Sequence, residues 1–577
     1  MRNQFKFVIV SNNIDHNSID TEFKKIELNR RYTVFVKGES VLIDSDIIIG
    51  LDGYCLPRKN SPANYQQLIN LDLIKEVINL KSDLHQTIKG FFSIFIIRKD
   101  SIKIYGDHFG IRKFFFEENG NAVSNDLFIL NNILRCTLSH INVAKFALFQ
   151  HNISGETYYD GIRYNRPGEL LELSEKFVFR SNWSPKMLVD IPKNSISPIE
   201  FSQQFSGIIG DYVKAFSPRG ISLTLTGGRD TRTVLASLLS IGVKPSVFTF
   251  GFPASADVQT AMMLSKKMGL NFANHDFEKT PEWYSDLVDK VIKDSSGLAH
   301  LHRAHRYAAI ESEVSRISNL DMVFLGSMGG DFIKGVHLND YIITEFIRLH
   351  YFQNKLSPSN ISLILDKHFI KYDDALLNDL MTFCQNVSFN NQDEKLVEFN
   401  LATEIIGHLH DSQDINIFLD HVKYVVIPFL DVDILEVLFA SKFNLFHHFR
   451  ISNNPLLQLR GGELQCEMIK TLQPQLANLP FASGYTPNDL LGNKFYYTSK
   501  RIYLKAFKTN KTSNFSYGSW FLNFIKGKLE EHGADENIFD ISKLKSALDS
   551  KEHKSTEGYW HKYSNIVHIN TIEEFMK

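Results

Sequence analysis

Cysteine and tryptophan are scarce in this 577-residue chain, which has four of each. The cysteines stand far apart, and no Cys-x-x-Cys pair occurs. Structural zinc sites and disulfide frameworks need cysteines at close, repeated spacing. The sequence therefore argues against both and favours a reducing compartment.

Long apolar runs and an excess of either charge are also lacking. No stretch approaches the ~20 apolar residues that cross a bilayer, and the first apolar run, residues 5–10, is too short for a signal peptide. The formal net charge of −2 implies neither a nucleic acid nor a membrane surface as partner. These features predict a globular cytoplasmic protein, long enough for roughly two to four domains.

A strand, a glycine turn and a helix follow one another between residues 221 and 240. Residues 221–226 alternate as a strand does, and Gly227 and Gly228 interrupt the pattern before a helical segment at 232–240. The first turn of a helix leaves N–H donors unpaired, and the helix dipole favours negative charge there. The arrangement is therefore suited to bind a polyphosphate.

Side chains around these glycines strengthen that interpretation. Thr226 and Thr231 supply hydroxyls, and Asp230 supplies a carboxylate that could hold Mg²⁺. An ordinary glycine turn after a buried strand is the alternative. It is weakened by the charged residues that follow, because charged groups beside a buried strand end need a partner.

Residues 226–231, Thr-Gly-Gly-Arg-Asp-Thr, resemble the pyrophosphatase loop of the asparagine synthetase family, usually Ser-Gly-Gly-x-Asp-Ser. Both serines are replaced by threonine, which keeps the hydroxyls. The common P-loop is excluded because it needs a lysine after its last glycine. The resemblance implies that ATP is bound with Mg²⁺ and that Thr226, Gly227, Gly228, Asp230 and Thr231 hold the nucleotide.

A second glycine-rich segment, Gly-Ser-Met-Gly-Gly-Asp at 326–331, follows an expected strand at 321–325. Family members carry Ser-Gly-Glu-Gly-Ser-Asp-Glu there, so Asp331 falls on the second magnesium-binding aspartate. The resemblance implies that Asp230 and Asp331 share the metal and that Gly326 and Gly251, each following a strand, border the nucleotide. The alternative is that Asp331 merely caps a helix.

A third segment, Tyr424-Val-Val-Ile-Pro-Phe-Leu-Asp431, is similar to the family's Arg-Val-Pro-Phe-Leu-Asp. The arginine position holds Val426. We expect this segment to pack behind the site. Three motifs in the family's order over about 210 residues make a chance resemblance improbable.

The N-terminal part resembles the glutaminase domain of class II amidotransferases. A Gly-x-Phe strand at 89–98, an Asp-x-x-Gly turn at 107–110 and a strand at 114–116 carry the resemblance. Those glutaminases use an N-terminal cysteine, whereas Arg2 and Asn3 follow Met1 here and Cys55 lies mid-chain. Without a nucleophile, hydrolysis of glutamine has no covalent route. We therefore expect this domain to have lost that activity and to support the second domain.

Strands and helices alternate in the remainder, which predicts a parallel, doubly wound sheet. The expected fold is α/β, with an N-terminal Ntn-like αββα domain over residues 1–190 and a C-terminal PP-loop domain with helical additions over residues 195–577. A polar linker is expected at 182–198. Further expected strands lie at 33–37, 41–49, 102–105, 245–251 and 272–277, and further helices at 200–216, 257–268, 305–317 and from residue 463 onward.

Basic residues near the two loops are candidates for the reacting groups. Arg229 and Lys334 are predicted catalytic cations that neutralise phosphate charge. Arg232, His302 and Arg303 are predicted to bind an anionic or peptide substrate. The alternatives are that Arg232 and Lys334 face solvent and that the histidines begin a solvated helix. A metal site at the His-x-His pair lacks a matching carboxylate.

The family reaction joins a carboxylate to an amine through an acyl-adenylate, with release of pyrophosphate. The resemblance therefore implies an ATP-dependent, AMP-forming ligase whose amine does not come from glutamine. Its carboxylate and amine substrates are small molecules or peptides, as in natural-product ring closure or sugar-acid amidation. A homodimer or a biosynthetic partner protein is compatible with this function. Because Met328 and Ala482 replace the family's usual reacting residues, a nucleotide-binding scaffold without the amide-forming step is the alternative.

Overall fold

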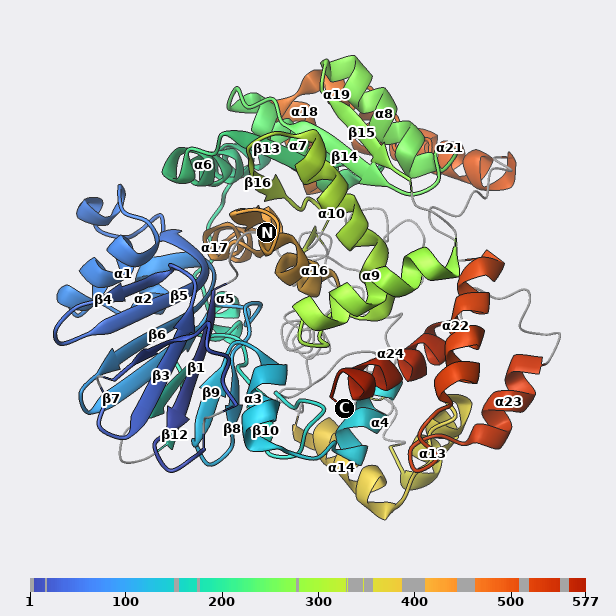
Figure 1. The fold of residues 1–577 in the computed structure, drawn as a ribbon. Helices are drawn as coiled ribbons and strands as arrows, with labels where there is room; N and C mark the ends of the chain where they lie inside the picture. The colour runs from blue at the N-terminus through green and yellow to red at the C-terminus, as the bar shows by residue number, and fades with distance from the viewer. Residues whose placement is uncertain are drawn as a thin grey trace.

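The computed structural model describes residues 5–15, 18–27, 29–149, 155–173, 177–276, 280–327, 329–330, 346, 356–386, 410–443, 462–507, 518–549 and 560–576. These residues form three sheets and many helices, so the expected α/β class is confirmed (Figure 1). Within the described ranges, no helix is both long enough and apolar enough to cross a bilayer.

Two antiparallel sheets of six strands make up most of the N-terminal part. The first has the order β10 (Ile162–Tyr164), β8 (Phe115–Glu117), β9 (Ala122–Ser124), β1 (Lys6–Ser11), β3 (Tyr32–Lys37), β2 (Lys24–Ile26). The second has the order β12 (Phe177–Ser181), β11 (Glu169–Leu173), β7 (Ser101–Gly106), β6 (Ile88–Arg98), β5 (Ile48–Pro57), β4 (Val41–Ile43).

The two sheets face each other across an apolar core. Phe7 and Val34 of the first sheet pack with Phe95 and Ile104 of the second. Another core lies between the second sheet and α1 (Asn70–Asn79) and α2 (Leu84–Thr87). Alternate residues of a strand point to opposite faces, so β5 and β6 contribute to both cores and are buried along nearly their whole length.

The third sheet is parallel, with the order β15 (Phe272–His275), β14 (Ser246–Phe250), β13 (Gly220–Thr224), β16 (Leu320–Phe324), β17 (Tyr424–Val426). Successive strands β13, β14 and β15 run outward on one side, and β16 returns to the other side of β13. The order therefore reverses between β13 and β16, which is where ligands bind in such sheets.

Helices pack on the parallel sheet in two groups. α7 (Arg229–Ser240) packs with α6 (Pro198–Phe216) and α18 (Glu463–Leu472), whereas α10 (Ala304–Arg316) packs with α9 (Pro281–Asp294) and α16 (His410–Leu419). The β13 residue Ser222 donates a hydrogen bond of 2.6 Å to Glu313 of α10. Its strand neighbours therefore face the other group.

Other helices complete the chain. They are α3 (Leu127–Leu134), α4 (His140–Phe149), α5 (Lys186–Val189), α8 (Ala256–Met268), α13 (Pro358–Lys367), α14 (Asp374–Asn386), α17 (Val432–Ala440), α19 (Pro474–Ala477), α20 (Pro487–Leu491), α21 (Lys494–Phe507), α22 (Gly518–His532), α23 (Ile541–Asp549) and α24 (Trp560–Met576). The C-terminal helix α24 packs against both α4 and α9, so the end of the chain contacts segments from its first third and its middle (Figure 1).

Some local predictions were wrong. Residues 41–49 form no single strand, because a turn at 44–47 separates β4 from β5. The helix expected to begin at 232 begins at Arg229, directly after the glycines. The expected polar linker at 182–198 contains α5 and buries Trp183 and Leu188, so part of it is packed. The division into two domains stays a prediction.

Candidate nucleotide site

Two loops meet at the carboxyl ends of β13 and β16. The Gly326 N–H donates to the Thr224 hydroxyl at 3.3 Å. A Cβ atom on Gly326 would lie 2.8 Å from the Cα atom of Thr231, so the second loop lies directly on the first turn of α7. The structure thus brings Gly326 and Thr231 together, although about 95 residues separate them in sequence.

Asp230 lies against the second loop. A Cβ atom on Gly330 would lie 2.6 Å from Asp230 Oδ1 and 3.0 Å from Oδ2. Gly330 immediately precedes Asp331, which lies outside the described residues, as do Met328 and Lys334. The Asp230 carboxylate is therefore next to Gly330, and the sharing of a metal by Asp230 and Asp331 stays a prediction.

The first loop orients two hydroxyls toward each other. Thr231 Oγ1 accepts a hydrogen bond of 3.1 Å from the Thr226 N–H and lies 3.2 Å from Thr226 Oγ1. Thr226 Oγ1 accepts another from the Gly228 N–H. Gly228 is the N-cap residue directly before α7 and, within the described chain, no side chain caps the helix there. Because the first N–H groups of a helix need acceptors, this exposed turn is suited to an anion.

Gly227 is enclosed by two segments that sequence reasoning did not connect. Its N–H donates to Asp257 Oδ1 at 2.9 Å, and its carbonyl accepts from the Ala482 N–H at 3.0 Å. Burial raises the pKa of Asp257 above its ordinary value. Asp257 lies in the first turn of α8, which follows β14, so the only sequence signal for it was its place after the neighbouring strand.

Gln465 of α18 is a second residue at this loop that the sequence did not indicate. Its Nε2 group donates to Asp230 Oδ1, and its side chain is fully buried. Nothing in the local sequence of α18 marks this residue, because the contact depends on how α18 packs against α7. Gln465 holds one oxygen of Asp230 at a set position.

The two predicted arginines have different environments. Arg229, the first residue of α7, is half-buried, and its guanidinium lies against Gly462. Arg232 is fully buried; it donates to the carbonyls of Leu479 and Pro480 at 2.6 and 2.7 Å. Burial lowers the pKa of Arg232 to about 10.

Through these hydrogen bonds Arg232 stabilises the segment that carries Ala482. The guanidinium also lies 4.3 Å from the centre of the Phe481 ring. The solvent-facing alternative for Arg232 was wrong, and its buried position does not support the predicted contact with a substrate.

The remaining predicted residues are Gly251, His302 and Arg303. Gly251 follows β14 with φ +131°, a conformation that favours glycine, and lies at the same edge of the sheet as the two loops. His302 is buried, and its ring contacts His300, which bonds Asn565 of α24 at 2.9 Å. This interior position does not support a substrate contact for His302; Arg303 is half-buried, and its role stays a prediction.

The segment Pro428-Phe-Leu-Asp431 lies behind the second loop. A Cβ atom on Gly329 would lie 2.9 Å from Leu430 Cδ2, and Gly329 has φ +74°. Asp431 caps α17, accepts from the Tyr212 hydroxyl at 2.7 Å and pairs with Lys89 of β6 at 3.0 Å. The segment therefore connects the second loop to the N-terminal sheets.

Comparisons with known proteins leave the family open. No protein-family model and no curated protein matches the sequence. Among solved structures, the chain is similar to an NMN synthetase from Francisella tularensis, with 16% identity over 38% of this chain and 97% of that chain and a TM-score of 0.21. It is similar to a glutamine-dependent NAD(+) synthetase from Cytophaga hutchinsonii, with 12% identity over 54% and 63% of the two chains and a TM-score of 0.22.

A third similar structure is the glutamine phosphoribosylpyrophosphate amidotransferase from B. subtilis, with 11% identity over 47% and 60% of the two chains and a TM-score of 0.17. Identities and TM-scores this low carry no argument about activity.

Proposed function

We propose that this protein is an ATP-dependent ligase of the asparagine synthetase-like kind. It adenylates a carboxylate with release of pyrophosphate and transfers the acyl group to an amine that does not come from glutamine. The carboxylate and the amine belong to small molecules or a peptide.

The observation that carries this proposal is the meeting of the two loops at the strand-order reversal. Asp230 lies against Gly330, and Gly326 lies against Thr231. A site for a triphosphate needs N–H donors at a helix start, close backbone approach and carboxylates for a divalent cation. The loop after β13 leads into the start of α7 and carries Asp230, and the loop after β16 approaches it closely through Gly326 and Gly330.

Each group then has a role. The N–H groups that begin α7, with the hydroxyls of Thr226 and Thr231, would hold the departing pyrophosphate. Asp230 and Asp331 would hold Mg²⁺, which when bound neutralises charge that develops on the phosphates. Arg229, half-buried at the start of α7, would add a fixed positive charge. Gln465 would keep the Asp230 carboxylate in position.

The N-terminal sheets support the proposal that glutamine is not the amine source. Cys55 is fully buried in β5, and burial raises the pKa of its thiol far above the ordinary value. A protonated, enclosed thiol cannot attack an amide. We assign these sheets a supporting role, through Lys89 and its ion pairs with Asp431 and Asp433.

A nucleotide-binding scaffold is the second candidate, and Ala482 favours it. Its backbone bonds Gly227 at 3.0 Å, so this position lies at the phosphate loop. The family's lysine at that position would place a cation there, whereas a methyl group supplies neither charge nor proton.

A pyrophosphate-release assay distinguishes the two candidates. The protein is incubated with ATP, Mg²⁺ and a panel of carboxylates, with and without amines. Acid-dependent, sustained release supports the ligase. ATP binding without release across the panel supports the scaffold, and failure to bind ATP at all contradicts both.

A further inference from the structure

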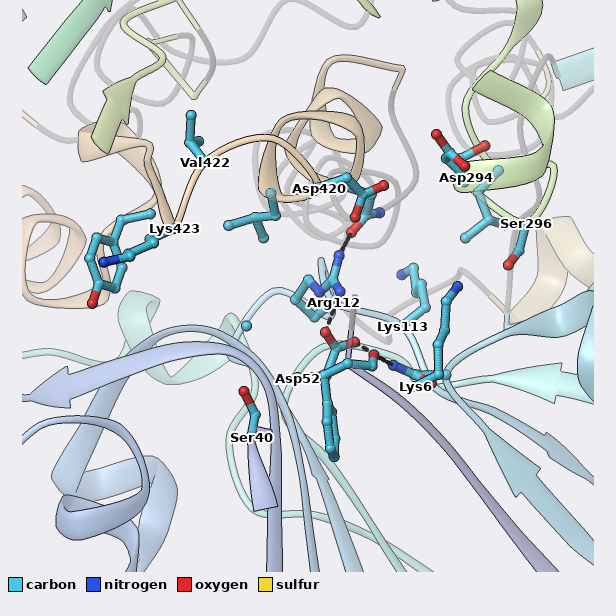
Figure 2. Close-up of a pocket in the computed structure, with 18 of the residues that line it drawn as sticks. Lys6, Ser40, Asp52, Arg112, Lys113, Asp294, Ser296, Asp420, Val422 and Lys423 are labelled. Atoms are coloured by element: carbon cyan, nitrogen blue, oxygen red, sulfur yellow. Dashed lines mark hydrogen bonds and ion pairs between the residues drawn. The ribbon is translucent and has the colours of Figure 1, made fainter. Parts of the chain in front are cut away.

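A polar cavity of about 290 Å³ lies between the N-terminal sheets and the parallel sheet. Its walls come from β1, β5, the turn after β7, the end of α9 and the segment after α16. Figure 2 shows the carboxylates of Asp294 and Asp420 across the cavity from Lys6 and Asp52. Lys423 and Tyr424 line the cavity, so it lies beside the start of β17. The glycine loops lie at the opposite, carboxyl ends of the parallel strands.

The positive charges in the cavity already have partners. Arg112 donates to Asp52 and, at 2.7 Å, to Asn416. Lys6 pairs with Asp126 at 2.7 Å, and Lys113 donates to the Gly110 carbonyl. Asp52 additionally accepts from Asn125 at 2.9 Å.

Asp420 is different. Its Oδ2 atom is buried and accepts no hydrogen bond from any described residue. Burial raises the pKa of Asp420 to about 8, because the nearby Arg112 and Lys6 only partly offset the loss of solvent and Asp294 and Asp52 add to the rise. The charged or titratable groups that interact with it are Lys6, Asp52, Arg112, Asp294 and Tyr307. Others line the cavity or the adjoining hollow with it, among them Lys113, Lys423, His421, Lys290, Glu311 and Arg316.

Access to Asp420 is wide. A larger hollow of about 1640 Å³ shares Lys6, Asp294 and Asp420 with the cavity. Its other walls include Phe23, Ile133 and Ile317. A ligand can therefore place a polar head in the cavity and an apolar tail in the hollow.

We propose that this cavity binds a small protonated amine, with its ammonium group against Asp420 and its tail in the larger hollow. An ammonium group supplies the missing donor to the buried Oδ2 atom and a positive charge for the carboxylate. The cavity lies at the start of β17 (Tyr424–Val426), whereas the glycine loops lie at the other ends of the parallel strands, about 7 Å further along β17. This ligand is therefore separate from the nucleotide, and the inference does not depend on the proposed ligase activity.

Titration calorimetry of the full chain with n-butylamine, without ATP, tests the inference. n-Butanol and butyrate are the matched neutral and anionic probes, and potassium chloride tests for a simple cation site. We expect butylamine to bind saturably and the other three probes not to bind. The affinity for butylamine should rise from pH 6 to pH 8. At pH 7, binding should release protons, seen as heats that differ between buffers of different ionisation enthalpy, because Asp420 must ionise.

Asp420→Asn keeps the shape of the side chain and removes its charge. It should weaken butylamine binding by about tenfold or more, equivalent to about 1.4 kcal/mol. Asp46→Asn, at an exposed carboxylate, is the control and should bind as the unmodified chain does. Equal binding of butanol or potassium, or unchanged binding by Asp420→Asn, would overturn the inference. If Asp420→Asn does not fold, binding of butylamine by the unmodified chain that is no tighter than binding of n-butanol overturns the inference.

Discussion

Gly227→Ala tests how tightly the first glycine loop is packed. A methyl group on Gly227 would lie 2.5 Å from Ala482 Cβ and 2.8 Å from Asp257 Oδ1. At Gly228, the nearest atom is the Thr226 hydroxyl at 3.3 Å. The two adjacent glycines therefore differ sharply in available space, and Gly228→Ala is a matched control.

The expected magnitude follows from two opposing terms. Overpacking a closed position costs about 1–3 kcal/mol, whereas Gly→Ala gains about 0.4–1 kcal/mol by restricting the unfolded chain. We expect Gly227→Ala to lower the free energy of unfolding by about 1–2 kcal/mol, and Gly228→Ala to change it by no more than about 0.5 kcal/mol.

A double-mutant cycle locates the source of the clash. Ala482→Gly removes the methyl group that the side chain introduced by Gly227→Ala would meet. Gly227→Ala combined with Ala482→Gly should therefore recover about 1 kcal/mol relative to the sum of the single changes. Urea unfolding followed by circular dichroism measures all four proteins. Equal stability of Gly227→Ala and Gly228→Ala, or strict additivity of the cycle, would show that Ala482 does not enclose this loop.

Three further predictions concern activity, the ion pairs and pH. Asp230→Asn and Asp331→Asn should each abolish pyrophosphate release without changing the circular dichroism spectrum, because Mg²⁺ is held firmly by carboxylates and not by amides. Full activity of either variant would show that the substituted residue is not a metal ligand. Lys89→Met should lower the free energy of unfolding by about 3 kcal/mol, because Asp431 and Asp433 would lose a buried cation. As a control, Lys103→Met removes a half-exposed ion pair with Glu172 at 3.9 Å and should lower the free energy of unfolding by less than about 1 kcal/mol. Equal losses of stability in urea unfolding would contradict the importance of the buried pairs. Burial lowers the pKa of His568 from 6.5 to about 3, so the unfolded chain binds a proton that the folded chain does not, and stability should fall as the pH drops from 6.5 toward 3. His568→Gln should flatten this part of the stability–pH curve, the exposed His140→Gln should not, and an unchanged slope in His568→Gln would refute the assignment.

Much of the local structure follows from pattern. β6 and α6 lie within two residues of the segments expected at 89–98 and 200–216, because apolar periodicity and turn residues act locally. Predictions of strand and helix bounds were poorer where the structure depends on contacts between residues far apart in the sequence. Ile43 is exposed next to a turn that ends β4, and a run of apolar residues around it resembled one continuous strand.

The candidate site divides in the same way. The glycines, hydroxyls and Asp230 could be found from their spacing, since a strand, a turn and a helix start bring them together over a few residues. Asp257 and Gln465 could not, because they reach the loop from α8 and α18. The burial of Arg232 could not be predicted either, because a charged residue in a helix is usually exposed and its partners lie about 245 positions away, at Leu476, Leu479 and Pro480.

The sequence alone determined which segments become strands, helices and glycine turns, because those depend on neighbours a few positions apart. Only the tertiary structure decided that the loops after β13 and β16 touch and that Asp420 Oδ2 is buried without a hydrogen-bond partner among the described residues. Both outcomes depend on contacts between residues far apart in the chain. Such contacts form when parallel strands pair in register and two apolar surfaces pack together. A local sequence pattern cannot predict them.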